Sequence, residues 1–109
     1  MMAPQWLLGF SLILFGLAWV TILLRRNLLV MSMGIQWMFV AVALAFVGFA
    51  RVHGAPSGGE ELVSARGEAA AIVVLSLAVV HLIVGLSVIL SQTRSRDSSD
   101  VDDASDLRW

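Results

Sequence analysis

The chain contains no cysteine and no lysine, and only 14% of its 109 residues are charged. Without cysteine there are no disulfides, thiolate metal ligands, cysteine-bound iron–sulfur clusters or cysteine nucleophiles. All seven basic residues are arginine, and they do not form the basic face that nucleic-acid binding requires. A soluble domain has about a quarter of its residues charged. This shortage of charge predicts a protein that lies in a lipid bilayer.

Three segments without formal charge, unless a histidine is protonated, make up most of the chain: residues 6–24, 28–49 and 69–91. As a helix the second would be roughly 33 Å long, which is about the thickness of a bilayer hydrocarbon core. The first residues lack the basic region of a signal peptide, and no small-residue cleavage site follows the first segment. We therefore expect an all-α membrane protein, with residues 1–91 forming one domain of three transmembrane helices.

The connections between these segments differ in length and chemistry. Only Arg25, Arg26 and Asn27 separate the first two segments, which predicts a tight antiparallel hairpin. Residues 51–68 contain a Gly-Ala-Pro-Ser-Gly-Gly run that is typical of a loop. Residues 92–109 are rich in Ser, Asp and Arg and have little apolar content, so they are predicted to form a disordered polar tail.

Arginine placement predicts the orientation of the chain. The turn at residues 25–26 and the tail would share one side of the membrane and carry five arginines. The amino terminus and residues 51–68 would share the other side, with two arginines and three glutamates. Because cytoplasmic segments carry the excess of basic residues, the amino terminus is expected outside and the tail in the cytoplasm.

The residues do not suggest a complete catalytic site, cofactor-binding site or metal site. There is no glycine-rich phosphate loop, no Ser-His-Asp set and no carboxylate pair within the membrane segments. The informative polar residues are Gln36 and His81, because polar side chains are costly in hydrocarbon. By residue count they lie about 13 Å and about 16 Å from the cytoplasmic ends of their helices, which places them at similar depth.

Two interpretations of Gln36 and His81 stay open. They could hydrogen-bond across the helix interface and only fix the packing, at about 0.6 kcal/mol on average. Alternatively they are candidates for a proton path, in which histidine can take up a proton near neutral pH and glutamine cannot. Arg25 and Arg26 likewise have two possible roles in the cytoplasmic loop: anchoring to anionic headgroups, or setting the electric field at the mouth of that path.

Two motifs carry a family resemblance. The Arg-Arg-Asn-Leu-Leu turn at residues 25–29 and the run Met31-x-x-Gly34-x-Gln36-x-Met38 resemble subunit K of NADH-quinone oxidoreductase. This is the small three-helix membrane subunit of respiratory complex I, and it is related to the C-type component of multisubunit cation/proton antiporters. The resemblance extends from residue 6 to about residue 91. Residues 77–86 support it, since they are similar to the family's small-residue run, acid and Gly-Leu.

The resemblance implies a non-redox, membrane-arm subunit of a proton-translocating enzyme in the cell inner membrane. Its helices would contribute to the proton path and to assembly with other membrane subunits. NAD and quinone would be used by the complex, with electron transfer in other subunits and no cofactor bound here. The family has glutamates where this chain has Gln36 and His81. Whether this chain moves protons in the way that is usual for the family is therefore an open question. The alternatives are a C-type component of an antiporter or a purely structural membrane protein.

Overall fold

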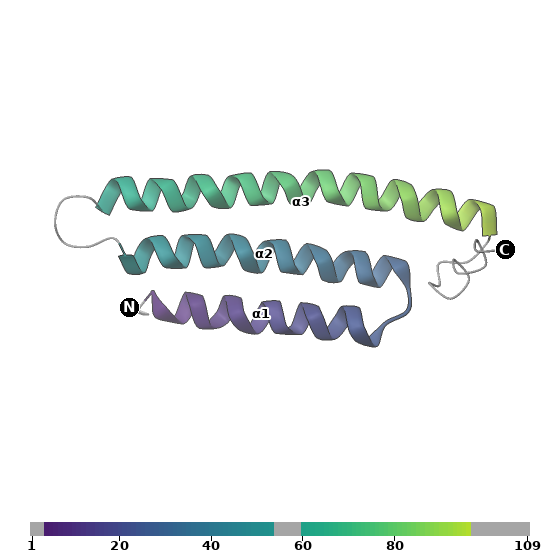
Figure 1. Ribbon diagram of the computed structural model, residues 1–109, viewed down its shortest axis with the longest axis horizontal. Coiled ribbons are helices and arrows are strands. Elements are labelled where there is room, and N and C mark those ends of the chain that lie inside the picture. The colour runs from purple at the N-terminus through teal and green to yellow at the C-terminus, as the bar shows by residue number, and fades with distance from the viewer. Residues whose placement is uncertain (1–3, 54–59, 97–109) are drawn as a thin grey trace.

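The computed structural model describes residues 4–53 and 60–96, which form three helices lying side by side (Figure 1). They are α1 (Gln5–Leu24), α2 (Leu28–His53) and α3 (Glu60–Arg96). Helix α2 lies in the middle and packs against α1 on one face and α3 on another, in an array 62 Å long. Each helix is long and apolar enough to cross a membrane. The prediction of an all-α protein with three transmembrane helices is confirmed.

The turn between α1 and α2 is built by two residues. Arg25 adopts an extended backbone (φ −111°, ψ 134°) that ends α1. The Asn27 side-chain Oδ1 then accepts a hydrogen bond of 2.9 Å from the Leu29 amide, and its carbonyl accepts one of 3.0 Å from the Met31 amide. Asparagine caps a helix in this way because its side chain satisfies an amide that has no partner within the helix. The predicted short antiparallel connection is confirmed.

The helices are longer than the uncharged segments. Helix α2 continues to His53 rather than residue 49, and α3 begins at Glu60 rather than residue 69. The prediction of a loop over residues 51–68 was therefore wrong for residues 51–53 and 60–68. Most of this stretch is made of good helix formers, glutamate, leucine, alanine and arginine, which continue a helix into water without an apolar face. The Gly-Ala-Pro-Ser-Gly-Gly run lies outside the described residues.

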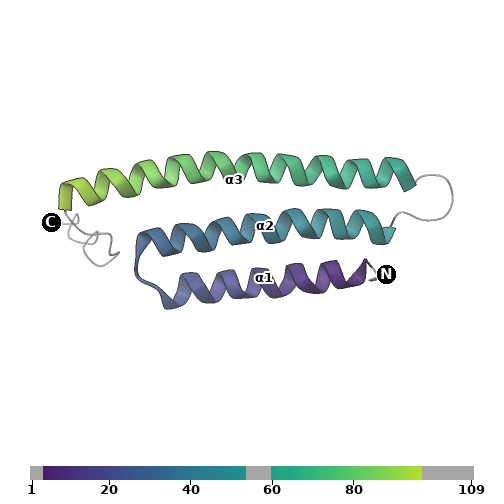
Figure 2. The same ribbon diagram turned by 180° about the vertical axis from the view of Figure 1, so that it is seen from behind.

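Helix α3 also continues past residue 91 and ends at Arg96, so the predicted disorder was wrong for residues 92–96. Residues 97–109 lie outside the described part of the chain. With 37 residues, α3 is roughly 55 Å long, well beyond the roughly 30 Å of a hydrocarbon core. Seen from behind, α3 extends past both ends of α2 (Figure 2). Helix α3 therefore continues beyond the uncharged segment, residues 69–91, at both ends.

Helices α2 and α3 pack through a seam of small residues, which we call the α2–α3 seam. Its buried members are Ser32, Ala43 and Ala50 on α2, and Ala71 and Ala78 on α3. At Gly67 a Cβ atom would collide with the Ala50 side chain and lie 3.0 Å from the Phe46 carbonyl oxygen. Small residues let helix backbones approach closely. Close packing of this kind drives helix association in a bilayer, where there is no hydrophobic driving force between helices.

Helices α1 and α2 also pack closely. A Cβ at Gly34 would lie 2.7 Å from the Ile22 side chain, and one at Gly48 would lie 2.8 Å from Leu8. Ala18 is buried in the same interface. The apolar side chains that face outward are large and exposed; Leu12 and Leu23, for example, are 72% and 74% exposed. Such surfaces require lipid or neighbouring subunits to cover them.

Candidate functional site

Gln36 reaches across the α2–α3 seam. Its side-chain Nε2 donates a hydrogen bond of 3.1 Å to the backbone carbonyl oxygen of Ala78. Gln36 is half-buried, whereas Ala78 is buried at 6% exposure. A carbonyl oxygen has two lone pairs, so the Ala78 carbonyl can accept this bond and also take part in the hydrogen bonding of its own helix. The bond therefore ties the two helices together without breaking α3.

His81 lies one turn further along α3 and is also half-buried. Its imidazole packs against the Phe39 ring of α2, with ring centroids 5.5 Å apart and planes tilted by 51°. Tilted aromatic pairs at this spacing are attractive because the edge of one ring faces the π-face of the other. Phe39 therefore contacts the imidazole across the α2–α3 seam.

The two contacts place Gln36 and His81 at the same level of the helix pair. Gln36 and Phe39 are one turn apart on α2, and Ala78 and His81 are one turn apart on α3. Gln36 contacts Ala78, and Phe39 contacts His81. No hydrogen bond joins Gln36 to His81 directly among the described residues. The seam thus places the two candidate residues at the same level, with the Gln36 amide bonded to Ala78 and the His81 ring packed on Phe39.

Ser32 extends the polar stretch by one further turn. It is 7% exposed, and its Oγ is buried without a hydrogen-bond partner. It faces Gly85 of α3, where a Cβ atom would lie 3.5 Å from that oxygen. Ser32 and Gln36 are four residues apart on one face of α2, as Gly85 and His81 are on α3. The candidate site therefore consists of Ser32, Gln36 and His81.

Arg25 and Arg26 lie apart from this group, in the turn between α1 and α2, and both are exposed. Residue 27 is nine residues from Gln36, or about 13 Å along the helix. The arginines therefore sit at the end of the bundle nearest to Ser32, too far away for a direct contact with the polar pair. Their position suits either of the two roles expected from the sequence.

The opposite end of the bundle carries its own polar links. Arg51 of α2 and Glu68 of α3 form an ion pair of 3.4 Å, and Ser64 donates to the same carboxylate at 3.2 Å. The side chains of the pair are 58% and 53% exposed, so water screens the attraction and it adds little stability. His53 is the last residue of α2, and its Nδ1 lies 3.0 Å from the Phe49 carbonyl oxygen. It is far from His81.

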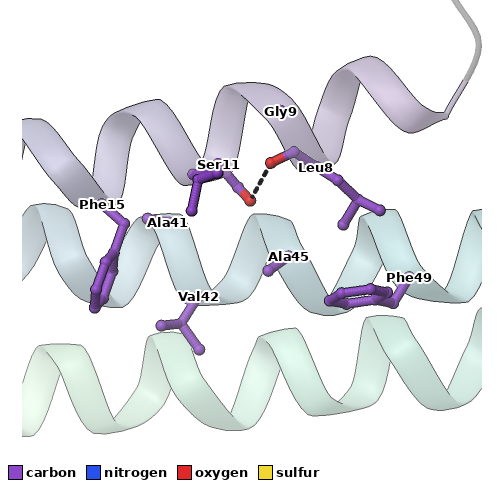
Figure 3. Close-up of a pocket in the computed structure, with 9 residues that line it drawn as sticks. Leu8, Gly9, Ser11, Phe15, Ala41, Val42, Ala45 and Phe49 are labelled. Atoms are coloured by element: carbon purple, nitrogen blue, oxygen red, sulfur yellow. Dashed lines mark hydrogen bonds between the residues drawn. The ribbon is translucent and has the colours of Figure 1, made fainter.

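A groove opens between α1 and α2 on the outer surface, with a cavity of about 390 Å³ (Figure 3). Phe15 and Phe49 lie toward its two ends, and Val42 and Ala45 line it from α2. The Ser11 hydroxyl donates to the Leu8 carbonyl at 2.9 Å, so it is already satisfied within α1. None of the lining residues can titrate or ligate a metal. The groove suits apolar packing and offers no chemistry.

The sequence did not identify Phe39, Ala78 and Gly85 as neighbours of the candidate residues. The signal lay in the alternating spacing of three and four residues, which runs through positions 32, 36, 39 and 43 on α2 and 78, 81 and 85 on α3. This spacing marks the face that one helix presents to another. It becomes informative only once α2 and α3 are known to be partners.

The chemistry available at the site is limited to hydrogen bonding and proton uptake. Among the residues that the structure describes, no three His, Asp or Glu side chains come together in a group that could hold a metal ion. Imidazole can accept and release a proton, whereas amide and hydroxyl groups can only relay or orient one. An embedded histidine beside polar partners is the arrangement expected where a membrane protein handles protons.

Comparison with known families agrees with this architecture. Residues 6–109 match the profile of the NADH-ubiquinone/plastoquinone oxidoreductase chain 4L family. The match covers nearly the whole chain, including all three helices and the polar residues of the α2–α3 seam. It also extends beyond residue 91, where the resemblance read from the motifs ended. The chain belongs to the chain 4L family, the subunit K family of complex I membrane subunits.

Proposed function

We propose that this chain is a membrane-arm subunit of a proton-translocating NADH-quinone oxidoreductase, and that Gln36 and His81 form part of its proton path. The observation that carries the proposal is the hydrogen bond from Gln36 to the Ala78 carbonyl, in the turn of α3 just before His81. It holds two polar groups at one level of a seam otherwise built from small and apolar residues. Polar groups are costly in hydrocarbon, so those that occur there usually have a function.

The two residues have different roles in this proposal. His81 takes up and releases the proton, because imidazole is the titratable group of the pair. Gln36 orients the seam and cannot carry a proton. A protonated imidazole is positive, whereas a protonated glutamate is neutral. The path therefore requires a carboxylate from a neighbouring membrane subunit to balance the charge while His81 holds a proton.

The remaining activity belongs to other subunits of the assembly. Electron transfer, with binding of NAD and quinone, takes place there, because this chain has neither cysteine for a cluster nor a nucleotide-binding motif. The exposed apolar faces of all three helices fit contacts with lipid and with those subunits. We place the chain in the cell inner membrane with its amino terminus outside, following the distribution of its arginines.

One observation favours a second candidate, a purely structural role. The Gln36 amide bonds to a backbone carbonyl rather than to His81, and a side chain that fastens helices together needs nothing more. In that case His81 and Phe39 form a packing contact alone. The two candidates differ in whether the imidazole has to change its protonation state.

Replacement of His81 with alanine in the assembled complex separates them. Protons moved per electron are measured in sealed vesicles, beside the rate of quinone reduction. The proton-path proposal predicts a lower ratio with quinone reduction retained, and Gln36→Glu should alter the same ratio. His53→Ala is the matched control, because His53 is exposed at the end of α2. An unchanged ratio in His81→Ala would leave the structural role.

A further inference from the structure

The charges at the two ends of the bundle are balanced in different ways. At one end, Arg51 of α2 forms an ion pair with Glu68 of α3 at 3.4 Å. The other end contains the turn between α1 and α2 and the last residues of α3 (Figure 1). Residues 1–59 and 69–96 include no Asp or Glu, so the described helices supply no carboxylate to this second end.

Four arginines lie at this second end, which we call the arginine end. Arg25 and Arg26 belong to the turn between α1 and α2, and Arg94 and Arg96 belong to the last turn of α3. The side chains of Arg25, Arg26 and Arg94 are exposed. Positive charges at one end of a small bundle repel one another, so an acidic partner is favoured there.

The acidic residues that the arginine end lacks follow directly along the chain. All five aspartates of the sequence lie in residues 97–109, which we call the acidic tail. The tail also holds Arg108, so five aspartates against one arginine give it a net charge of −4. This charge is equal and opposite to that of the four arginines at the arginine end.

The tail begins close enough to the turn for a contact. Ser32 of α2 and Gly85 of α3 are at the same level, since a Cβ on Gly85 would lie 3.5 Å from the Ser32 Oγ. From that level α2 begins four residues earlier and α3 ends eleven residues later, so α3 ends roughly 10 Å beyond the start of α2. With packed helix axes about 8–10 Å apart, the turn is on the order of 14 Å from the end of α3. An extended chain covers at most about 3.3–3.6 Å per residue, so the tail can reach the turn from Asp100 onward.

We propose that the acidic tail binds the α1–α2 turn of its own chain through Arg25 and Arg26. The carboxylates that meet them are those of Asp100, Asp102 and Asp103. Guanidinium and carboxylate groups form charge-assisted hydrogen bonds, often two at once. Because the tail is tethered to the end of α3, its effective concentration at the turn is on the order of millimolar, an advantage that a separate acidic segment does not have. This contact does not depend on the proposed proton path.

The contact acts as an electrostatic clasp between the turn and α3. It holds the α1–α2 turn to the end of α3 in addition to the α2–α3 seam, and it lowers the positive charge that this end presents. Arg25 and Arg26 are exposed, so salt screens the attraction and the contact weakens as ionic strength rises. A guanidinium has five N–H donors, so a bound carboxylate leaves other donors for lipid headgroups.

The test measures how often the tail meets the turn in the assembled complex. The chain has no cysteine, so Leu24→Cys and Val101→Cys together allow only one disulfide within it. Leu24 is the last residue of α1, beside Arg25, and is 75% exposed. The complex is placed in vesicles of phosphatidylcholine, with or without phosphatidylglycerol, and oxidised. The linked peptides are then quantified by mass spectrometry.

Two tail variants carry this cysteine pair. The first has Asp100→Asn, Asp102→Asn and Asp103→Asn, which removes the charge, and the second has glutamate at the same positions as the matched control. We expect the disulfide with the natural tail and with the glutamate variant, and a severalfold lower yield with the asparagine variant. The yield with the natural tail should fall as salt is raised. A charge swap, with Arg25→Asp and Arg26→Asp in the turn and arginine at the three tail positions, should restore the yield.

Equal yields in the asparagine and glutamate variants would overturn the proposal, because chance encounters alone would then link the tail to the turn. A disulfide that forms in phosphatidylcholine but is lost when phosphatidylglycerol is added would also overturn it, since lipid headgroups would then occupy the arginines in place of the tail. If the charge swap does not assemble, the asparagine and glutamate variants decide.

Discussion

The Gln36 side-chain amide donates to the Ala78 carbonyl oxygen at 3.1 Å, across the seam between two helices that are 42 residues apart in sequence at this point. The family resemblance associates this position with a glutamate. An ionised carboxylate would bring an acceptor against another acceptor here, whereas an amide provides the donor that the carbonyl needs. A glutamine at this position therefore suits the local geometry, and under the proposed function His81 is the residue of this seam that carries the proton.

Gln36→Leu should weaken the assembly by a small amount. The change removes the bond to Ala78 and keeps an apolar side chain of similar size in the seam. Hydrogen bonds between membrane helices are worth about 0.6 kcal/mol on average and up to about 1.7. We expect a lower temperature of complex dissociation in mild detergent, measured on native gels. Gln5→Leu, at the exposed start of α1, is the control, and equal temperatures for both variants would show that the bond contributes nothing.

Phe39→Leu should disturb the position of His81 while leaving its chemistry intact. The ring contact has centroids 5.5 Å apart, and aromatic pairs contribute about 0.5–1.5 kcal/mol beyond burial. With the imidazole less constrained, we expect fewer protons per electron and retained quinone reduction. Phe49→Leu is a matched control, because Phe49 packs on His53 in a similar pair at 6.1 Å, away from the site. Indistinguishable ratios in the two variants would mean that Phe39 does not position the imidazole.

Gly67→Ala should separate α2 from α3. The new methyl group would collide with Ala50 and lie 3.0 Å from the Phe46 carbonyl oxygen, and backbone atoms cannot move aside cheaply. Overpacking of this kind costs about 1–3 kcal/mol. Less complex should assemble, as measured by the yield of intact complex after mild extraction. Gly9→Ala provides the comparison, since its Cβ meets no atom of this chain within 4 Å. Loss of assembly in Gly9→Ala instead would reveal a neighbouring subunit packed on α1.

The number of helices and the membrane class could be predicted because bilayer thickness and charge placement constrain a chain directly. An uncharged segment of 19 or more residues, such as residues 6–24, has few alternatives to a helix in lipid, because its backbone must satisfy its own hydrogen bonds there. The ends of α2 and α3 were less predictable. Residues 60–68 are charged and hold a glycine, which resembles a loop, yet the same residues form a helix readily in water.

The candidate residues could also be predicted, but their partners could not. Gln36 and His81 stand out because polar groups are rare in the segments. The acceptor for Gln36 is a backbone carbonyl, and every residue carries one, so no residue type marks Ala78 as the partner. Likewise, whether the Ser32 hydroxyl has a hydrogen-bond partner depends on its rotamer, which the sequence does not give. These features require the register between α2 and α3, which follows from close contacts such as Gly67 with Ala50.

The orientation of the bundle remains a prediction from its arginines. A reporter fused after residue 109 should be active in the cytoplasm, and one inserted near residue 58 should be active outside, because five of the seven arginines lie on the side of the tail. Paired reporters, one active in each compartment, measure both positions. The reverse pattern of activities would show that the arginines do not set the orientation.

Replacement of both Arg25 and Arg26 with alanine should reduce assembly without changing proton transport in the complexes that form. Each arginine near an anionic membrane surface is attracted by about 1 kcal/mol, so the double change weakens the anchor of the α1–α2 turn. Both side chains are exposed and lie beyond residue 27, which is itself about 13 Å along the helix from Gln36, and mobile ions screen an exposed charge at such a separation. The amount of intact complex and the ratio of protons to electrons are measured on the same vesicles. Normal assembly with a lowered ratio would instead assign these arginines to the field at the mouth of the proton path.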